Sequence, residues 1–214
     1  MPSGDPKTPE SHAWRHARPS HTPWRSRCAG VLLVALAVAA SSSRETEAQE
    51  GVFLTEEQAP SAVFPDAESF QREVVPVSVD LQSRLRARFG GAEPSVWEDA
   101  YVTFRALRGG HVIGHAVIVE EIGKHRPITF VVGVRPDGRI SDVAVMAYRE
   151  AYGGEVRSRR FLVQYRDKSG ADRLQPHDDI KNIAGATLSV EAAGRAVKKA
   201  AALVQALAGE GSGW

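Results

Sequence analysis

Apolar and polar residues follow a period of two in the middle of this 214-residue chain. Two such runs, residues 101–107 and 111–119, are separated by Gly109-Gly110, and two more, 128–134 and 140–148, flank the segment 135–138 (Arg-Pro-Asp-Gly). A period of two is typical of β-strands, and glycine and proline between the runs suit tight turns. The pattern therefore predicts two hairpins with four antiparallel strands.

Short helices are predicted before the strands. Thr55 and Gln58 form a capping-box pattern, and Pro60 would keep the helix that follows short or make it bend. Asp66 would cap a further helical turn that reaches Phe70.

Two longer helices are indicated by apolar residues at helical spacing. In the first, Leu81, Leu85 and Phe89 recur among arginines, and Gly90-Gly91 follows as a stop. In the second, the apolar positions are Ala193, Val197, Ala200, Val204 and Leu207. The polar positions expected to point away from the core are Arg195, Lys198, Lys199 and Gln205, and Gly209 would close this helix. Together the elements predict one α+β domain at residues 51–208, with an antiparallel or mixed sheet backed by helices.

The first 50 residues have a different composition. Residues 1–27 are basic, and 29–40 form an apolar run of about a dozen residues, which is short for a membrane span but typical of a signal-peptide core. We expect residues 1–40 to be a signal peptide or a signal anchor, and the protein to be exported to the periplasm or another extracytoplasmic space. Residues 41–50 would be a linker and 209–214 a flexible tail.

Charge and cysteine content exclude several classes of function. Residues 1–40 hold 5 of the 27 Lys and Arg residues and 2 of the 26 Asp and Glu residues, so the remainder carries 22 basic and 24 acidic residues. Without a basic stripe, nucleic acid is not an expected partner. The only cysteine, Cys28, precedes the apolar run, so cleavage after that run would leave no disulfide, thiolate metal site or c-type haem attachment.

The histidines do not form a convincing metal site. His111 and His115 would project to the same side of a strand but too far apart for one ion, and they are interpreted as structural or surface residues. His177 lies beside Asp178-Asp179, where a metal site is conceivable, although a polar loop is the simpler interpretation. No Ser-His-Asp set or catalytic cysteine is evident.

The stretch 178–189 ends a polar loop and opens the alanine-rich helix. Thr187 or Ser189 could simply cap that helix. Alternatively, the unpaired N–H groups and the dipole of the helix start could hold a phosphate on or beside Thr187, with Gly185 letting the backbone come close to it.

The sequence of residues 183–189, Ile-Ala-Gly-Ala-Thr-Leu-Ser, resembles the Ser-Gly-Ala-Thr attachment sequence of the FMN-binding domain family. This family includes flavin subunits of Rnf and sodium-pumping NADH:quinone reductase complexes. Further segments resemble the same family in the same order: 123–130, Tyr-Arg-Glu at 148–150, Gly-Gly-Glu-Val at 153–156 and Phe-Leu-x-Gln-aromatic at 161–165. The resemblance spans roughly residues 51–207. Two positions depart from it, because Lys181 and Ala184 stand where the family usually has Asp and Ser.

The resemblance implies that FMN is joined through its phosphate to Thr187 by an ApbE-like flavin transferase, which uses FAD and magnesium. The backbone of Gly185, Ala186, Thr187 and Leu188 would anchor the phosphate. Arg149, Glu150 and Gln164 are the candidates for the edge of the flavin ring, and Lys124 for the phosphate or its surroundings.

The function expected from this resemblance is electron transfer in a membrane-associated or extracytoplasmic redox chain. Two alternatives stay open: a flavin-free binding or accessory module with the same fold, which the two departures favour, and a flavin-dependent reductase acting on a small substrate.

Overall fold

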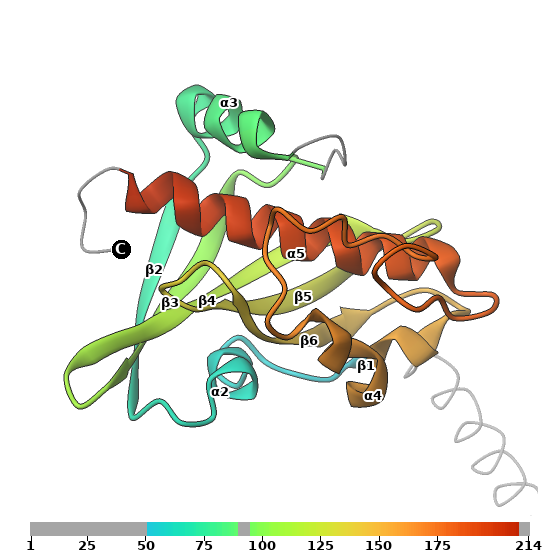
Figure 1. Cartoon of the computed structure of the whole chain (residues 1–214), viewed down its shortest axis with the longest axis horizontal. Coiled ribbons are helices and arrows are strands. Elements are labelled where there is room, and N and C mark those ends of the chain that lie inside the picture. Colours follow the sequence, from blue (N-terminus) through green and yellow to red (C-terminus); the bar gives the residue numbers. More distant parts are fainter. Residues whose placement is uncertain (1–50, 90–94, 210–214) are drawn as a thin grey trace, which may run out of the picture. The chain divides into compact units, whose positions relative to one another are not determined.

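A six-stranded antiparallel sheet lies at the centre of the computed structural model, which describes residues 51–89 and 95–209 (Figure 1). The strands are β1 (Gly51–Val52), β2 (Ser69–Pro76), β3 (Ala100–Arg108), β4 (His111–Ile122), β5 (Pro127–Val134) and β6 (Ile140–Tyr148), in the order β1-β6-β5-β4-β3-β2. The proposed signal segment, the linker, the stop at Gly90-Gly91 and residues 210–214 of the tail lie outside the described residues.

The two predicted hairpins are confirmed. β3 pairs with β4 and β5 with β6, both antiparallel. Gly109 and Gly110 turn the first hairpin with φ of 58° and 77°, and Gly138 turns the second with φ of 79°, values that glycine adopts readily. The α+β fold with a single domain is therefore as predicted, and the sheet is wholly antiparallel.

The prediction of a helical turn from Asp66 to Phe70 is wrong. Phe70 lies in β2, which pairs with β3 from Ser69↔Leu107 to Pro76↔Ala100. β2 is an edge strand in which only Val75 is buried, so its sequence lacks the alternation that marks a half-buried strand.

The first helix also differs in detail from its prediction. Thr55 and Gln58 exchange backbone-to-side-chain hydrogen bonds of 3.0 and 3.4 Å, but they close a turn that precedes the helix. Helix α2 (Ala59–Val63) starts after Gln58, with Pro60 in its first turn. Because N–H groups of a first turn have no intrahelical acceptor, Pro60 begins this short helix without bending it.

The two longer helices are confirmed. Helix α3 (Val79–Arg88) buries Leu81 and Leu85, and Ser78 caps it by accepting a 3.1 Å hydrogen bond from the Leu81 N–H. Helix α5 (Thr187–Ala208) buries all five apolar positions predicted for it. Gly209 is its C-cap residue, with φ of −71°.

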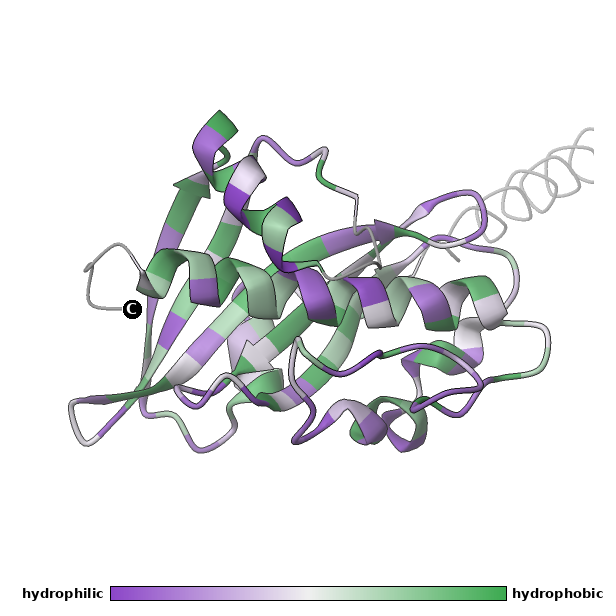
Figure 2. Cartoon of the chain, turned by 45° about the horizontal axis from the view of Figure 1, so that its top comes forward, coloured by the Kyte–Doolittle hydropathy of each residue, from purple (hydrophilic) through white to green (hydrophobic). Residues whose placement is uncertain are grey.

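Helices cover both faces of the sheet (Figure 1). α5 packs on one face and contributes most of its length to the main hydrophobic cluster. α2 packs on the other face, where Val63 and Phe64 meet Phe104, Val131 and Met146 in a second cluster. Figure 2 shows the hydrophilic positions that interrupt the hydrophobic surface of α5. Within residues 51–89 and 95–209, no helix has both the length and the apolarity that crossing a membrane requires.

Candidate functional site

Thr187 is the first residue of α5, and the loop 166–186 leads into it. Ala186 is the N-cap residue and makes no side-chain capping hydrogen bond. The interpretation of Thr187 or Ser189 as an ordinary N-cap is therefore wrong, because the residue that flanks the helix is an alanine. The first N–H groups of α5 receive no acceptor from the N-cap side chain.

The Thr187 hydroxyl has one polar contact. Its Oγ1 accepts a 2.9 Å hydrogen bond from the Nδ2 group of Asn182, and the side chain is partly exposed. The same Nδ2 atom lies 2.9 Å from Nε2 of His177. Thr187, Asn182 and His177 thus form a short polar chain at the start of the helix.

Ser189 has a different environment, although it is only two residues away. It is 4% exposed, and its Oγ lies 3.0 Å from the Tyr148 hydroxyl, which donates to the Tyr152 carbonyl. Burial raises the pKa of Tyr148, and the Ser189 hydrogen bond only partly opposes this. Gly153 must be glycine, because a Cβ there would lie 2.8 Å from the Tyr148 hydroxyl and 3.1 Å from Ser189 Oγ at a φ of +84°.

A cleft of about 510 Å³ runs along α5 from Thr187 towards Lys198. Its outer wall is the segment 173–177, which meets the helix at Gly194, where a Cβ would lie 2.0 Å from the Leu174 carbonyl oxygen. Leu174 and His177 hold left-handed φ angles of 57° and 66°, which non-glycine residues seldom adopt. The wall is therefore shaped by local strain and close packing.

Three cationic side chains and one carboxylate, Glu191, line the cleft. Arg173 pairs with Asp178 at 2.6 Å, and Arg195 pairs with Glu121 at 3.1 Å. Lys198 is 7% exposed and lines the cleft, and among residues 51–89 and 95–209 it has no hydrogen-bond or ion-pair partner. An anionic ligand in the cleft would meet this ammonium group.

Gln164 supports the loop that leads to Thr187. Its Oε1 accepts a 2.8 Å hydrogen bond from the Lys181 N–H, which fixes the residue next to Asn182. A hollow of about 390 Å³ lies between the two segments and is lined in part by Phe161, Val163 and Ile183. Gln164 and Asn182 also line this hollow, and Asn182 connects it to Thr187 through the 2.9 Å hydrogen bond.

Three predicted residues lie apart from the cleft at Thr187. Glu150 accepts hydrogen bonds from the His125 and Arg126 N–H groups in the β4–β5 turn and lines a separate hollow of about 370 Å³. Arg149 donates to Thr129 Oγ1 at 3.3 Å, and Lys124 is exposed in the turn. Burial would raise the pKa of Glu150, but backbone hydrogen bonds from Arg126, His125 and Lys124 outweigh it and hold that pKa below its usual range.

Comparison with known protein families identifies this arrangement. Residues 123–202 match the family model described as the FMN-binding domain. This part of the chain is similar to FMN-binding domains. The match includes β5, β6, the loop 166–186 and most of α5, and hence every predicted cofactor residue from Lys124 to Leu188. No curated protein matches the chain.

His111 and His115 lie in β4, and His177 lies in the loop that precedes α5. Within the described residues no three His, Cys, Asp or Glu side chains gather as a metal site. The expectation that His111 and His115 share a side fails, because a register shift near Ala106 and Leu107 breaks the alternation between them. His115 is buried, and burial, followed by the charge of Arg105, lowers its pKa to about 4.

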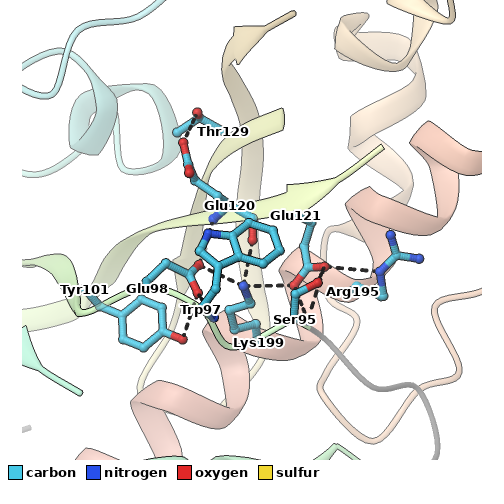
Figure 3. Close-up of polar contacts among 9 residues, drawn as sticks. All are labelled: Ser95, Trp97, Glu98, Tyr101, Glu120, Glu121, Thr129, Arg195 and Lys199. Carbon is cyan, nitrogen blue, oxygen red and sulfur yellow. Dashed lines mark hydrogen bonds and ion pairs between the residues drawn. The ribbon is translucent and has the colours of Figure 1, made fainter. Parts of the chain in front are cut away.

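The largest correction concerns the polar face of α5. Lys199 was expected in solvent but is 0% exposed, and its Nζ contacts Glu98 Oε1 at 2.8 Å, Glu121 Oε1 at 2.9 Å and the Glu120 carbonyl at 2.6 Å (Figure 3). The physical reason is that two carboxylates face the helix here and attract a cation inward: the buried Glu121 at the end of β4, and Glu98 in the segment before β3.

Neighbouring groups complete this buried cluster (Figure 3). Arg195 binds the other Glu121 oxygen at 3.1 Å and donates to the Ile122 carbonyl at 2.7 Å, so it too faces the sheet. Ser95 donates to Glu121, and Tyr101 donates to Glu98. Only Gln205 among the four expected polar positions is exposed. The cluster attaches α5 to the sheet.

Sequence reasoning missed Asn182 as well. Its polar side chain five residues before Thr187 was a visible signal, but its contact with the hydroxyl depends on the turn formed by 183–186, in which the Ala186 N–H donates to the Ile183 carbonyl at 3.0 Å. Such loop closures are not encoded by a periodic pattern.

Proposed function

We propose that the FMN-binding domain carries FMN as a phosphoester on Thr187 and serves as an electron carrier. The observation that carries the proposal is the contrast between two hydroxyls. Ser189 is buried and bonded to Tyr148, whereas Thr187 caps nothing and lines an open cleft. A transferase would therefore reach the Thr187 oxygen and not the Ser189 oxygen.

The surroundings of Thr187 suit a phosphate. The start of a 22-residue helix presents unpaired N–H groups and the positive end of its dipole. Nothing lies within 4 Å of the position that a Gly185 Cβ would take, so the turn over the helix start is open. Lys198 adds a positive charge farther along the same cleft.

The flavin ring has a suitable seat nearby. The hollow lined by Phe161, Val163 and Ile183 offers apolar contacts, and Gln164 offers an amide for the ring edge. FMN, when bound, supplies one- or two-electron chemistry, while the protein supplies the anchor, the orientation and the electrostatic environment. Gln164 thus keeps its proposed role at the ring edge in addition to its contact with Lys181.

Electron transfer is preferred to substrate conversion because the chain has no evident Ser-His-Asp set or catalytic cysteine. We propose that the protein is exported through the N-terminal segment and works with membrane-bound or extracytoplasmic redox partners. An ApbE-like flavin transferase would install the flavin outside the cytoplasm.

Mass spectrometry of tryptic peptides tests the attachment. The full chain is produced together with an active flavin transferase, and the FMN mass is expected on the peptide that contains Thr187. Thr187→Ala is expected to remove it, and Ser189→Ala is the matched control that keeps it. Unmodified Thr187 in the wild-type protein, or flavin on Ser189, would overturn the proposal.

A flavin-free binding module is the second candidate, favoured by Lys181 and Ala184 in place of the family's Asp and Ser. Both residues are exposed, so their side chains are available to a transferase. If the departures weaken recognition, Lys181→Asp with Ala184→Ser should raise the fraction of flavinylated protein. A colourless protein that stays colourless after these changes would favour the binding module.

A further inference from the structure

Asn182 makes the only side-chain hydrogen bond to the Thr187 hydroxyl that the described residues provide. Its Nδ2 atom is 2.9 Å from Thr187 Oγ1 and 2.9 Å from His177 Nε2. A primary amide nitrogen carries two hydrogens, so one points to each acceptor. In this orientation of the amide, His177 accepts at Nε2.

The amide oxygen of Asn182 makes no comparable hydrogen bond within the described residues. Its Oδ1 is buried and has no hydrogen-bond partner in the described part of the chain. The opposite amide orientation would present Oδ1 to Thr187 and His177 and bury Nδ2 without an acceptor. Either orientation leaves one buried amide atom unsatisfied, which disfavours folding. Stability therefore does not account for an asparagine at this position.

We propose that Asn182 is a positioning residue that holds the Thr187 oxygen for flavin transfer, an inference that rests on the attachment proposed above. The amide N–H occupies one lone pair of Oγ1 and thereby fixes the rotation of the hydroxyl. Thr187 lines the cleft, so the other lone pair and the O–H bond are left for a group that enters it. His177 fixes the amide in turn by accepting its second hydrogen.

The chemistry of the transfer explains the value of a donor at this place. The Thr187 oxygen attacks the flavin-side phosphorus of flavin adenine dinucleotide and forms an O–P bond. The pyrophosphate P–O bond breaks, AMP leaves with the bonding electrons, and the hydroxyl proton passes to water; nothing is oxidised or reduced. A donated N–H favours the partial negative charge that develops on the oxygen as its proton leaves. The same N–H still has an acceptor afterwards, because the ester oxygen replaces the hydroxyl.

The position of Asn182 is set in advance by backbone contacts. Gln164 holds the Lys181 N–H on one side, and the Ala186 to Ile183 hydrogen bond closes the turn on the other. Preorganisation of this kind lowers the barrier of a step without changing the affinity of the two proteins. Asn182 should therefore act on the turnover number of the transferase and not on its KM for this chain.

The experiment uses the purified flavin-free full chain as the acceptor for a flavin transferase, with FAD and magnesium. The initial rate of flavin incorporation is measured over a range of acceptor concentrations. We expect Asn182→Ala to lower kcat about tenfold or more and to change the acceptor KM less than about threefold. His177→Gln, which disturbs only the orientation of the amide, should lower kcat less. After long incubation both variants should carry FMN on Thr187.

The controls separate this inference from the proposed attachment. Wild-type and Thr187→Ala chains in the same assay report on the attachment itself, and thermal unfolding reports on the fold of every variant. A wild-type rate for Asn182→Ala, or a raised KM with unchanged kcat, overturns the positioning role while leaving Thr187 as the flavin carrier. If Asn182→Ala unfolds, Asn182→Asp replaces it. This near-isosteric carboxylate cannot donate, so wild-type kcat in that variant would equally overturn the proposal.

Discussion

Polar side chains have opposite environments in the middle and at the start of α5. In the middle, Lys199 is fully buried and contacts three oxygen atoms, and Arg195 binds the Glu121 carboxylate that Lys199 also contacts (Figure 3). At its first residue, Thr187 has one donor and opens onto a cleft. One helix can thus be attached to a sheet by buried ion pairs in its middle while its first residue stays accessible to a ligand.

The largest expected effect is a loss of unfolding free energy at the buried ion pairs of Lys199. Lys199→Met removes one of the two cations that contact the fully buried Glu121 side chain, and Arg195 remains as the other. Breaking a buried pair from one side typically costs about 3–5 kcal/mol of unfolding free energy. Urea denaturation should show a loss in this range.

The neighbouring Lys198→Met is the matched control. Lys198 has a buried stem but no ion pair within the described residues, so methionine should cost less than about 1 kcal/mol. Equal losses for the two variants would mean that the ion pairs of Lys199 do not stabilise the attachment of α5.

The second prediction concerns pH and β4, the strand that carries Glu121. The pKa of His115 falls from 6.5 to about 4 on folding, so the unfolded chain binds the proton more tightly. This contribution is fully present above pH 6.5 and is lost as the pH falls towards 4, about 3 kcal/mol in all. His115→Gln should flatten the pH dependence of the unfolding free energy in this window. Parallel curves for the two proteins would contradict the assignment.

The third prediction tests the contact between α5 and the cleft wall at Gly194. Gly194→Ala places a Cβ 2.0 Å from the Leu174 carbonyl oxygen and should push the cleft wall away, at about 1–3 kcal/mol. The better helix propensity of alanine, about 1 kcal/mol, offsets part of this. Gly209→Ala is the control, because its nearest contact would be 3.6 Å away and its φ suits alanine. A Gly194→Ala protein as stable as wild type would show that the wall moves freely.

The smallest effect is expected at Thr187. The Thr187 hydroxyl caps nothing, and its one hydrogen bond, from Asn182, is only partly buried, so Thr187→Ala should change the unfolding free energy by less than about 0.5 kcal/mol. Ser189→Ala should cost about 1 kcal/mol, since it removes a buried hydrogen bond to Tyr148. Chemical denaturation of the two flavin-free variants would measure this, and the reverse order would place the structural role on Thr187.

The elements with a strong period were predictable from sequence. β3 to β6 are rich in apolar residues because clusters of buried side chains cover both faces of the sheet. α5 repeats every three to four residues because its apolar stripe covers the sheet. β2 was not predictable, because its exposed residues follow no period. Lys199 was misplaced because helical spacing describes only the helix, and the carboxylates that draw the lysine inward come from other elements, Glu98 and Glu121.

The candidate site was partly predictable. Thr187 and Gln164 were found through sequence resemblance, and the structure brings the segments that carry them together at Lys181. Glu150 was expected at the ring edge, but its carboxylate accepts backbone hydrogen bonds from the β4–β5 turn, a contact that joins residues 24 and 25 positions apart. Asn182 depended on a loop closure that no local pattern reveals.

The edge strand β2 has a consequence for how copies of the domain meet one another. An unpaired strand edge can recruit a strand from another molecule and so begin aggregation. β2 ends the sheet with exposed Gln71, Arg72 and Glu73, and Pro76 removes one backbone donor from the edge. The charged side chains and the missing donor make this edge a poor template for intermolecular pairing. The irregular sequence of β2 is therefore suited to keeping the protein monodisperse at high concentration.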